Sequence, residues 1–469
     1  MWNLDERLKN EPLYVRIYLQ LKQMIIEGKY TENQKMPSKR KLAQTLKVSP
    51  LTVDQAYQQL IVEGYVYSIE KSGYYANKYT DMFTQTQTKK ISHQTEEIPN
   101  QSYTYSFETH TVDTSLFPQA TWAKLARQVL SENHEQLLNE SNPKGLYALR
   151  KEIARYLEIY RGMHVDIDQI ILGSGSTSLI GLIVEILGRN NHYAMENPGY
   201  PKIYQLFKSN DVKLSLISLD TLGLSIDSLK SSNASIVHIT PSHQYPSSIV
   251  MPISRRIELL QWASEKINRY IIEDDYDSEF RYQGKPIPAI HGLDQSDSII
   301  YMNTFTKTLA PSFRINYMVL PKKLLKRYEN ISSYHGCTVP NLEQHILYKF
   351  MNEGHFERHV NRMKNMYKQK IDMIIKILSK YSGFTMFGHD SGLHFVLEIH
   401  KKIDEQELLI HLDHLSIKIV SMKYFYNELD SNQPIQLIIG YAGIPIHEIE
   451  THFTYLLESI HSFITKHSQ

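Results

Sequence analysis

A lysine set among small hydroxyl side chains is the most chemically suggestive residue of this chain. Lys307 lies in the string Thr-Phe-Thr-Lys-Thr-Leu-Ala-Pro-Ser-Phe-Arg, which covers residues 304–314. An amine in this setting can form an imine with an aldehyde ligand. Thr304, Thr306 and Arg314 would bind a phosphate group of the same ligand. A lysine among threonines is most often a surface residue, so the string needs support from elsewhere in the chain.

An earlier segment suits the ring of the same aldehyde. The apolar run 270–272 leads into Asp274 and Tyr276. A buried carboxylate at Asp274 would keep a pyridine nitrogen protonated, and Tyr276 can donate a hydrogen bond to the ring phenolate. Tyr200, which follows a Pro-Gly pair, can stack on the ring face. Together these residues predict pyridoxal 5'-phosphate (PLP) as the cofactor, with Lys307 as its Schiff-base residue.

A turn rich in glycine and serine offers a place for the phosphate. Residues 173–178 read Gly-Ser-Gly-Ser-Thr-Ser and open a predicted helix. Backbone N–H groups at a helix start bind phosphate well, so Gly175, Ser176 and Thr177 are predicted phosphate contacts. Such a turn says little by itself and gains weight from the hydroxyls and the arginine around the lysine.

The elements that must position these residues follow an α/β pattern. Between residues 107 and 469, short apolar runs alternate with amphipathic helical stretches. The runs cover residues 170–172, 193–195, 236–239, 270–272 and 299–302. Loops rich in Gly, Pro, Ser, Thr or Asp follow them, which predicts a mostly parallel sheet that binds ligands at the carboxyl ends of its strands.

The N-terminal part of the chain predicts a winged helix-turn-helix. Three helical patterns follow one another, the second opening at the N-cap Ser38 and the third at Ser49 before Pro50. The third pattern ends at Gly64, and residues 65–75 then form a short hairpin. Two short helices followed by a β-wing are typical of DNA-binding heads, although a three-helix packing domain is the plainer alternative.

The charge distribution favours a polyanionic partner for this head. Residues 1–80 hold 12 Lys and Arg against 8 Asp and Glu, whereas the rest of the chain holds 39 against 42. The predicted DNA contacts are Lys39, Arg40 and Lys41 to phosphates, Thr52, Gln55, Gln58 and Gln59 to the major groove, and Lys71 in the hairpin turn.

The amino-acid sequences of several segments resemble those of a known family. Residues 36–64 closely resemble the head of the GntR regulators, although Pro50 stands where that family usually has arginine. The body resembles fold type I aminotransferases, and specifically the MocR/GabR subfamily of GntR regulators. The segments that carry this likeness are residues 115–118, 149–150, 240–246, 271–281 and 304–317.

The resemblance implies an architecture and a set of partners. It predicts a winged helix-turn-helix in residues 1–77 and a PLP-dependent fold type I aminotransferase-like domain in 107–469. Residues 78–106 are rich in Thr, Gln, Ser and Lys without a sustained period, which predicts a flexible linker between the two. The resemblance also implies a double-stranded DNA operator as partner and a homodimer, often head-to-tail, in which each head lies on the body of the partner.

One departure from the family concerns effector binding. Relatives that sense an amino acid grip its carboxylate with an arginine after a Gly-aromatic-small string, but here Gly443 follows that string and no arginine occurs after Arg362. Either an amino compound is held by Lys202, Arg314 or the partner chain, or the effector is PLP itself and the protein reports vitamin B6 status. The missing arginine favours PLP.

Two rival functions remain open at this stage, namely an active aminotransferase that carries a DNA-binding head and a regulator that has lost its cofactor. The missing arginine argues against efficient transamination, which needs an oriented substrate. The single cysteine, Cys337, excludes an intrachain disulfide and makes a cysteine-based zinc site improbable, and we predict no metal. The polar N-terminus and the lack of a long apolar run predict a cytoplasmic protein without a membrane span.

Overall fold

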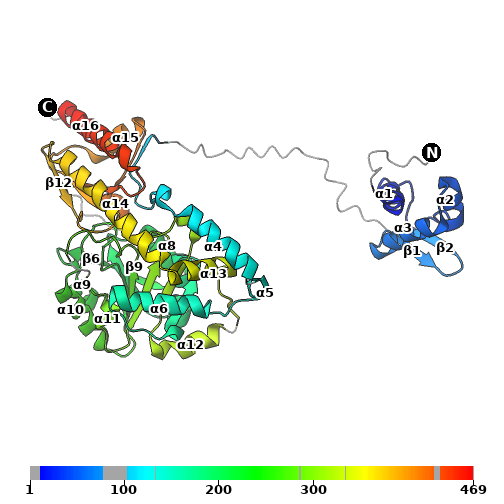
Figure 1. The fold of residues 1–469 in the computed structure, drawn as a ribbon, viewed down its shortest axis with the longest axis horizontal. Helices are drawn as coiled ribbons and strands as arrows, with labels where there is room; N and C mark the ends of the chain where they lie inside the picture. Colours follow the sequence, from blue (N-terminus) through cyan, green and yellow to red (C-terminus); the bar gives the residue numbers. More distant parts are fainter. Residues whose placement is uncertain are drawn as a thin grey trace. The chain divides into compact units, whose positions relative to one another are not determined.

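Two compact units make up the chain, residues 1–101 and 102–469, and Figure 1 draws both. The computed structural model describes residues 11–77, 103–132, 134–284, 287–332, 334–426 and 434–467. Most of the predicted linker therefore lies outside the described residues. Its last residues belong to the second unit, because β3 (Tyr105–Ser106) pairs in parallel with β14 (Ile417–Lys418).

The first unit is a winged helix-turn-helix, as predicted. Its elements are α1 (Leu13–Ile26), α2 (Lys39–Leu46), α3 (Pro50–Val62), β1 (Val66–Ile69) and β2 (Gly73–Ala76). Ser38 accepts a hydrogen bond from the backbone N–H of Lys41, and Ser49 accepts one from Thr52, so both predicted caps are present. The apolar faces of the three helices and the hairpin enclose one small core.

An eight-stranded sheet forms the centre of the second unit. Its strand order is β4-β11-β10-β9-β8-β5-β6-β7. The strands are β4 (Ile170–Gly173), β5 (His192–Asn197), β6 (Lys213–Asp220), β7 (Gly223–Leu224), β8 (Ile236–Ile239), β9 (Tyr270–Asp275), β10 (Ile299–Thr304) and β11 (Asn316–Val319). The neighbours from β10 to β6 run parallel, whereas β11 and β7 pair antiparallel. The predicted apolar runs all fall in this sheet.

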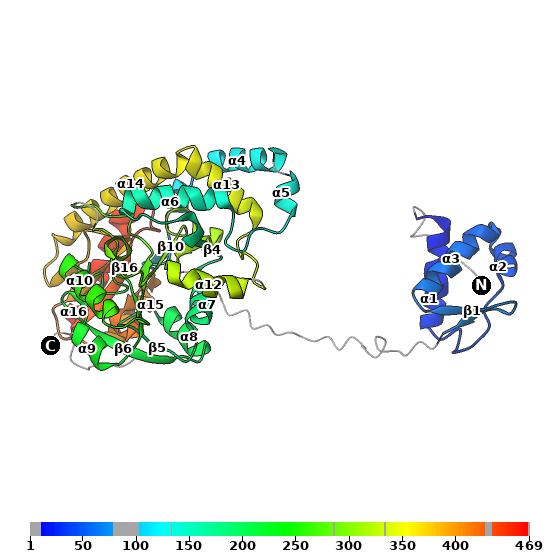
Figure 2. The same cartoon turned by 90° about the horizontal axis from the view of Figure 1, so that it is seen from below.

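Helices cover both faces of the large sheet (Figures 1 and 2). One face packs against α7 (Ser176–Leu187), α8 (Pro201–Ser209) and α12 (Lys322–Ser332). The other packs against α6 (Tyr147–Arg161), α9 (Ile226–Ser231), α10 (Ile253–Ser264), α11 (Ile290–Leu293) and α13 (Asn341–Asn352), with α4 (Gln119–Glu132) and α5 (His134–Leu138) beyond. Because both faces are covered, β4, the start of β9 and the start of β10 are continuous apolar runs rather than alternating ones.

A smaller antiparallel sheet completes the second unit. Its order is β12 (Phe384–Phe387), β13 (His394–Ile399), β16 (Ile435–Gly440) and β15 (Val420–Ser421). It shares a core with α14 (His355–Leu378), α15 (Glu405–His414) and α16 (Ile449–His467). Within the described ranges, no helix combines the length and the apolar character that crossing a bilayer requires.

The segment 105–113 carries the chain from β3 into the centre of the second unit. The backbone N–H of Phe107 donates to Lys418, and that of Gly440 donates to Phe107, both at 2.9 Å. At the end of the segment, Asp113 forms a buried ion pair with Lys370 on α14, with Nζ 2.9 Å from the carboxylate.

Replacing Asp113 by Ala should lower the free energy of unfolding of the second unit by about 3–5 kcal/mol, because Lys370 would keep a buried charge without its partner. Denaturant titration followed by tryptophan fluorescence measures the loss, since Trp122 and Trp262 lie in this unit. Lys322→Ala is the control, because its pair with Asp166 is exposed and its removal should leave stability nearly unchanged. Equal losses in the two variants would contradict the role of the buried pair.

Candidate cofactor-binding site

A cavity of about 460 Å³ opens at the carboxyl ends of the central strands. The predicted residues that line it are Lys307, Asp274, Tyr276, Tyr200, Gly175, Ser176, Thr304, Thr306, Arg314 and Lys202. Thr177 is exposed in the first turn of α7 and does not line the cavity. Segments that lie far apart in the sequence thus bring nearly all of the predicted side chains to one place.

Lys307 lies in the loop after β10, with its amine at the cavity wall. Its Nζ donates a hydrogen bond to the backbone carbonyl of Thr109 at 2.9 Å. Burial lowers the pKa of Lys307 to about 8, against the opposing effect of the Asp277 carboxylate. A substantial fraction of the amine is therefore neutral near physiological pH, which is the form that attacks an aldehyde.

One end of the cavity has the features of an anion site. Gly175 precedes α7 with φ +103°, and a Cβ there would lie 2.4 Å from the Arg314 guanidinium, so only glycine fits. No side chain caps the start of α7, and Gly175 and Ser176 line the cavity, so the start of this helix suits a bound anion. The hydroxyls of Thr304 and Thr306 lie 2.7 Å apart beside them.

The other end presents a carboxylate held by a histidine. Oδ2 of Asp274, at the end of β9, lies 3.4 Å from Nε2 of His238 on the neighbouring β8. This contact orients the carboxylate, which lines the cavity and can accept a hydrogen bond from a protonated ring nitrogen. Sequence reasoning missed His238, although a lone polar residue in the apolar run 236–239 was the available signal.

Two tyrosines stand between these ends. The Tyr276 hydroxyl donates to the backbone carbonyl of His243 at 2.9 Å, and burial raises its pKa well above the ordinary value, so it stays a proton donor. Tyr200 is 41% exposed and meets Tyr245 edge-on at 5.3 Å between ring centroids. Tyr245 and Thr109, which also line the cavity, were not predicted site residues.

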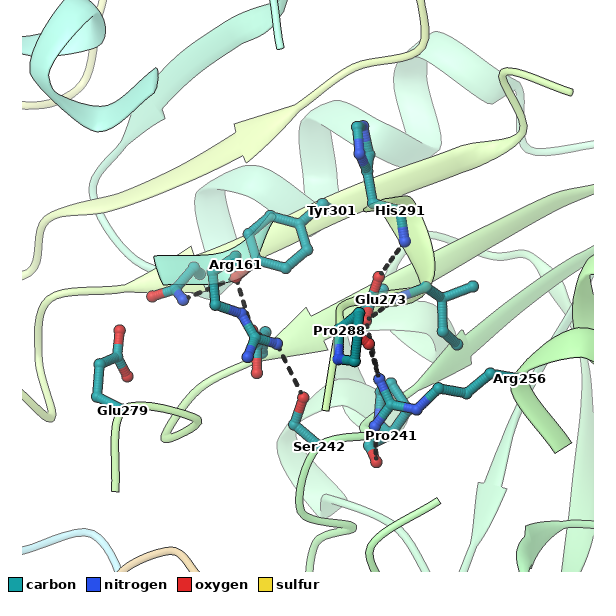
Figure 3. Close-up of polar contacts among 12 residues, drawn as sticks. Arg161, Pro241, Ser242, Arg256, Glu273, Glu279, Pro288, His291 and Tyr301 are labelled. Atoms are coloured by element: carbon teal, nitrogen blue, oxygen red, sulfur yellow. Dashed lines mark hydrogen bonds and ion pairs between the residues drawn. The ribbon is translucent and has the colours of Figure 1, made fainter. Parts of the chain in front are cut away.

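The opposite face of β9 carries a buried polar cluster (Figure 3). Asp275 accepts a hydrogen bond from Tyr301 at 2.6 Å and pairs with Arg161 at 2.6 Å. Glu273 accepts hydrogen bonds from the backbone N–H groups of Ile290 and His291, each at 2.9 Å. Because successive strand residues face opposite sides, Asp274 faces the cavity while its two acidic neighbours hold the sheet behind it.

A second, larger cavity of about 780 Å³ adjoins the first. The two share Thr109, His110, Tyr200, Lys202 and Tyr245 as lining residues. Lys202 is exposed and forms no ion pair within the part of the chain that the structure describes. It therefore offers a positive charge to a ligand that extends from one cavity into the other.

At Gly443, where relatives have an arginine, another segment of the chain fills the space that a side chain would need. A Cβ on Gly443 would lie 2.4 Å from the Thr111 hydroxyl, and a Cβ on Gly440 would lie 2.2 Å from the backbone carbonyl of Glu108. The segment 108–111 passes over both glycines, so a larger side chain at either position would displace it.

The head presents most of its predicted DNA contacts to solvent. Arg40, Lys41, Gln55, Gln58 and Lys71 are exposed, and Thr52 is half-buried. Two of the predicted DNA contacts instead bind other side chains of the head. Lys39 pairs with Asp54 at 2.7 Å, and Gln59 donates to Glu63.

Comparisons with known proteins agree with both units. The family model "Aminotransferase class I and II" matches residues 105–435, and "Bacterial regulatory proteins, gntR family" matches residues 13–75. The uncharacterized HTH-type transcriptional regulator YdeL of Bacillus subtilis is 34% identical over 92% of this chain and 93% of its own length. The chain belongs to the GntR regulators that carry an aminotransferase-like domain. The predicted family is thereby confirmed.

More distant relatives share the same architecture. The probable rhizopine catabolism regulatory protein MocR of Rhizobium meliloti is 28% identical over 94% of this chain and 92% of its own. The pyridoxine biosynthesis regulator PdxR of Corynebacterium glutamicum is 27% identical over 82% and 83%. Among solved structures, the multiple substrate aminotransferase of Thermococcus profundus shares the fold, with a TM-score of 0.69 and 24% identity over 79% of this chain and 94% of that one.

The rate at which the cofactor-free regulator captures PLP should rise with pH and reach half its maximum near pH 8, because the pKa of Lys307 is about 8. Stopped-flow absorbance after mixing with PLP measures this rate, and Lys307→Ala supplies the background of other lysines. A midpoint near the ordinary lysine pKa of about 10.4 would show that burial does not set the charge of this amine.

Proposed function

We propose that the aminotransferase-like domain binds PLP covalently through Lys307 and that its occupancy controls the DNA-binding head. The observation that carries this proposal is one cavity lined by the half-buried amine of Lys307, an anion site and a histidine-supported carboxylate. The amine suits the aldehyde of PLP, the anion site its phosphate and the carboxylate its ring nitrogen. When bound, PLP supplies an aldehyde and an electron-withdrawing ring.

Within this proposal, PLP itself is the preferred effector. The segment 108–111 occupies the space over Gly443, so a carboxylate clamp cannot be built there, and only Lys202 and Arg314 offer positive charge to an amino compound. PdxR, whose name refers to pyridoxine biosynthesis, is similar to 82% of this chain. The alternative of an active aminotransferase fits less well, because Arg314 lies at the anion site and Lys202 offers a substrate acid only a point charge.

The contact between Lys307 and Thr109 suggests how occupancy reaches the head. A covalent bond from Nζ to a bound aldehyde would compete with the 2.9 Å hydrogen bond that Nζ donates to the Thr109 carbonyl. Thr109 lies in the segment 105–113, close to the start of the second unit, and the first two residues of this segment are the last two of the predicted linker. A shift of this segment is a physical route by which the body biases the position of the head.

The proposed partners are a double-stranded DNA operator and a second copy of the chain. The exposed residues of α2 and α3 suit phosphate and groove contacts. Large apolar side chains that suit a homodimer interface are exposed on α5 and α6, namely Leu138, Tyr147, Ile159 and Tyr160. We retain the head-to-tail arrangement as part of the proposal.

Saturation with PLP should change the affinity of the wild-type protein for a DNA duplex that it has selected from a random library, and Lys307→Ala should abolish both this change and the visible absorbance of bound PLP. Fluorescence anisotropy of the labelled duplex and absorbance spectra measure the two effects. Titration with amino acids in place of PLP distinguishes the effectors. A wild-type protein that stays colourless and yields no borohydride-trapped adduct would refute the proposal.

Arg40→Ala should weaken DNA binding and reduce the slope of log affinity against log salt by about 1, because one phosphate contact is lost. The control is Lys29→Ala, which removes the same charge from beyond the end of α1 and should leave the slope unchanged. Affinity measured across a salt series distinguishes the two. Identical slopes in the wild type and both variants would remove Arg40 from the DNA interface.

A further inference from the structure

A stripe of uncharged side chains runs along the outward side of α3, the second helix of the helix-turn-helix. Its members follow one another at spacings of four, three and four residues, which places them on one side of a helix, and are Leu51, Gln55, Gln58 and Val62. All are exposed, and Leu51 and Val62 expose 69% and 81% of their surface. The core of the head lies on the opposite side of α3, so this uncharged stripe is available to a partner.

Contacts within the head fix which side of α3 faces outward. The Tyr57 ring stacks on Tyr74 of β2 at 4.2 Å between centroids, and its hydroxyl donates to the backbone carbonyl of Pro37 at 2.7 Å. The Asp54 carboxylate accepts a hydrogen bond from Lys39 of α2, also at 2.7 Å. These contacts join α3 to the wing and to the start of α2, so the helix cannot rotate about its axis to bury the uncharged stripe.

The charged groups of the head leave α3 without a cation for guanine. The sequence of α3 contains neither lysine nor arginine, and its one charged residue, Asp54, is paired with Lys39. Arginine and lysine are the side chains that read O6 and N7 of guanine in the major groove. The exposed cations Arg40, Lys41 and Lys47 precede α3 in the chain. The helix itself therefore cannot supply the commonest specific contact to a G·C pair.

The uncharged stripe instead carries groups that match an A·T pair. The amide of glutamine offers one acceptor and two donors, which fit N6 and N7 of adenine, and an apolar side chain fits the 5-methyl group of thymine. Within residues 11–77, the described part of the head, no side-chain hydrogen bond engages Gln55 or Gln58. Gln59, which lies beside the stripe, is by contrast engaged by Glu63.

We propose that α3 recognises A·T base pairs, with Leu51 against the 5-methyl group of a thymine and Gln55 and Gln58 on adenine edges. Leu51 is then a specificity-determining residue at the N-terminal end of the helix, the end that contacts base edges in helix-turn-helix proteins. Val62 lies at the other end of α3 and takes no part. The inference rests on the DNA-binding part of the proposed function and is independent of PLP.

The first test removes a methyl group from the DNA and leaves the protein unchanged. The full-length wild type, with its PLP content held constant, selects duplexes from a random library, and the selected half-sites should contain A·T pairs at their most uniform positions. Each thymine of a selected half-site is then replaced in turn by deoxyuridine. At the thymine that meets Leu51, fluorescence anisotropy should show an affinity about fourfold lower, the effect of exposing one buried methyl group.

The second test pairs this change with variants of the uncharged stripe. Leu51→Ala should bind the thymine and deoxyuridine duplexes equally, because the side chain that distinguishes them is gone. Val62→Ala is the matched control, since it removes an equally exposed apolar side chain from the far end of the same stripe and should behave like the wild type. A repeated selection with Gln55→Arg should change one preferred pair from A·T to G·C.

Several results would overturn the inference and leave DNA binding intact. These are a wild type that loses no affinity at any deoxyuridine, a Leu51→Ala variant that stays as sensitive to deoxyuridine as the wild type, and selected half-sites whose most uniform pairs are G·C. Equal losses of affinity in Leu51→Ala and Val62→Ala would also overturn it, because the stripe would then act as a protein contact. A wild type that selects no duplex at all would instead remove the proposed function.

Discussion

The parallel pairing of β9 with β10 is the constraint on which the site depends. In this register Asp274 lies beside Met302, so both strands end at the same edge of the sheet. Asp274 leaves β9 there, and the loop that carries Lys307 leaves β10 only a few residues later. The distance between the two ends of a bound ring is thereby set by the spacing of neighbouring strands and not by flexible loops.

Such a site needs rigid support, which the buried polar cluster of Figure 3 provides. Asp275 joins β9 to Tyr301 on β10 and to Arg161 on α6, and Glu273 joins β9 to the start of α11. Buried charges are costly when they lack partners, so this network tolerates little displacement of the two strands. On one face of β9, Asp274 lines the cavity. On the other face, Glu273 and Asp275 bind neighbouring elements of the fold.

The segment 105–113 connects several parts of the second unit. It is tied to the smaller sheet through β14 and Gly440, to α14 through the pair of Asp113 with Lys370, and to the cavity through Thr109. The same segment closes the space over Gly443. The path of this one segment therefore explains two features. It leaves no room for a carboxylate-binding side chain at Gly443, and it brings Thr109 into contact with Lys307.

The sequence by itself determined the two-part architecture, the family and most residues around the cavity, because caps, apolar runs and the strings around Asp274 and Lys307 are local signals. The paired serine caps and the strands at residues 170–172 and 270–272 are where those signals predicted them. Local patterns cannot show which distant segments meet. Only the tertiary structure placed His238 behind Asp274, Thr109 against Lys307 and Thr111 over Gly443, and only it showed that Lys39 is paired with Asp54. These contacts join residues far apart in the chain, and sheet register and packing decide them.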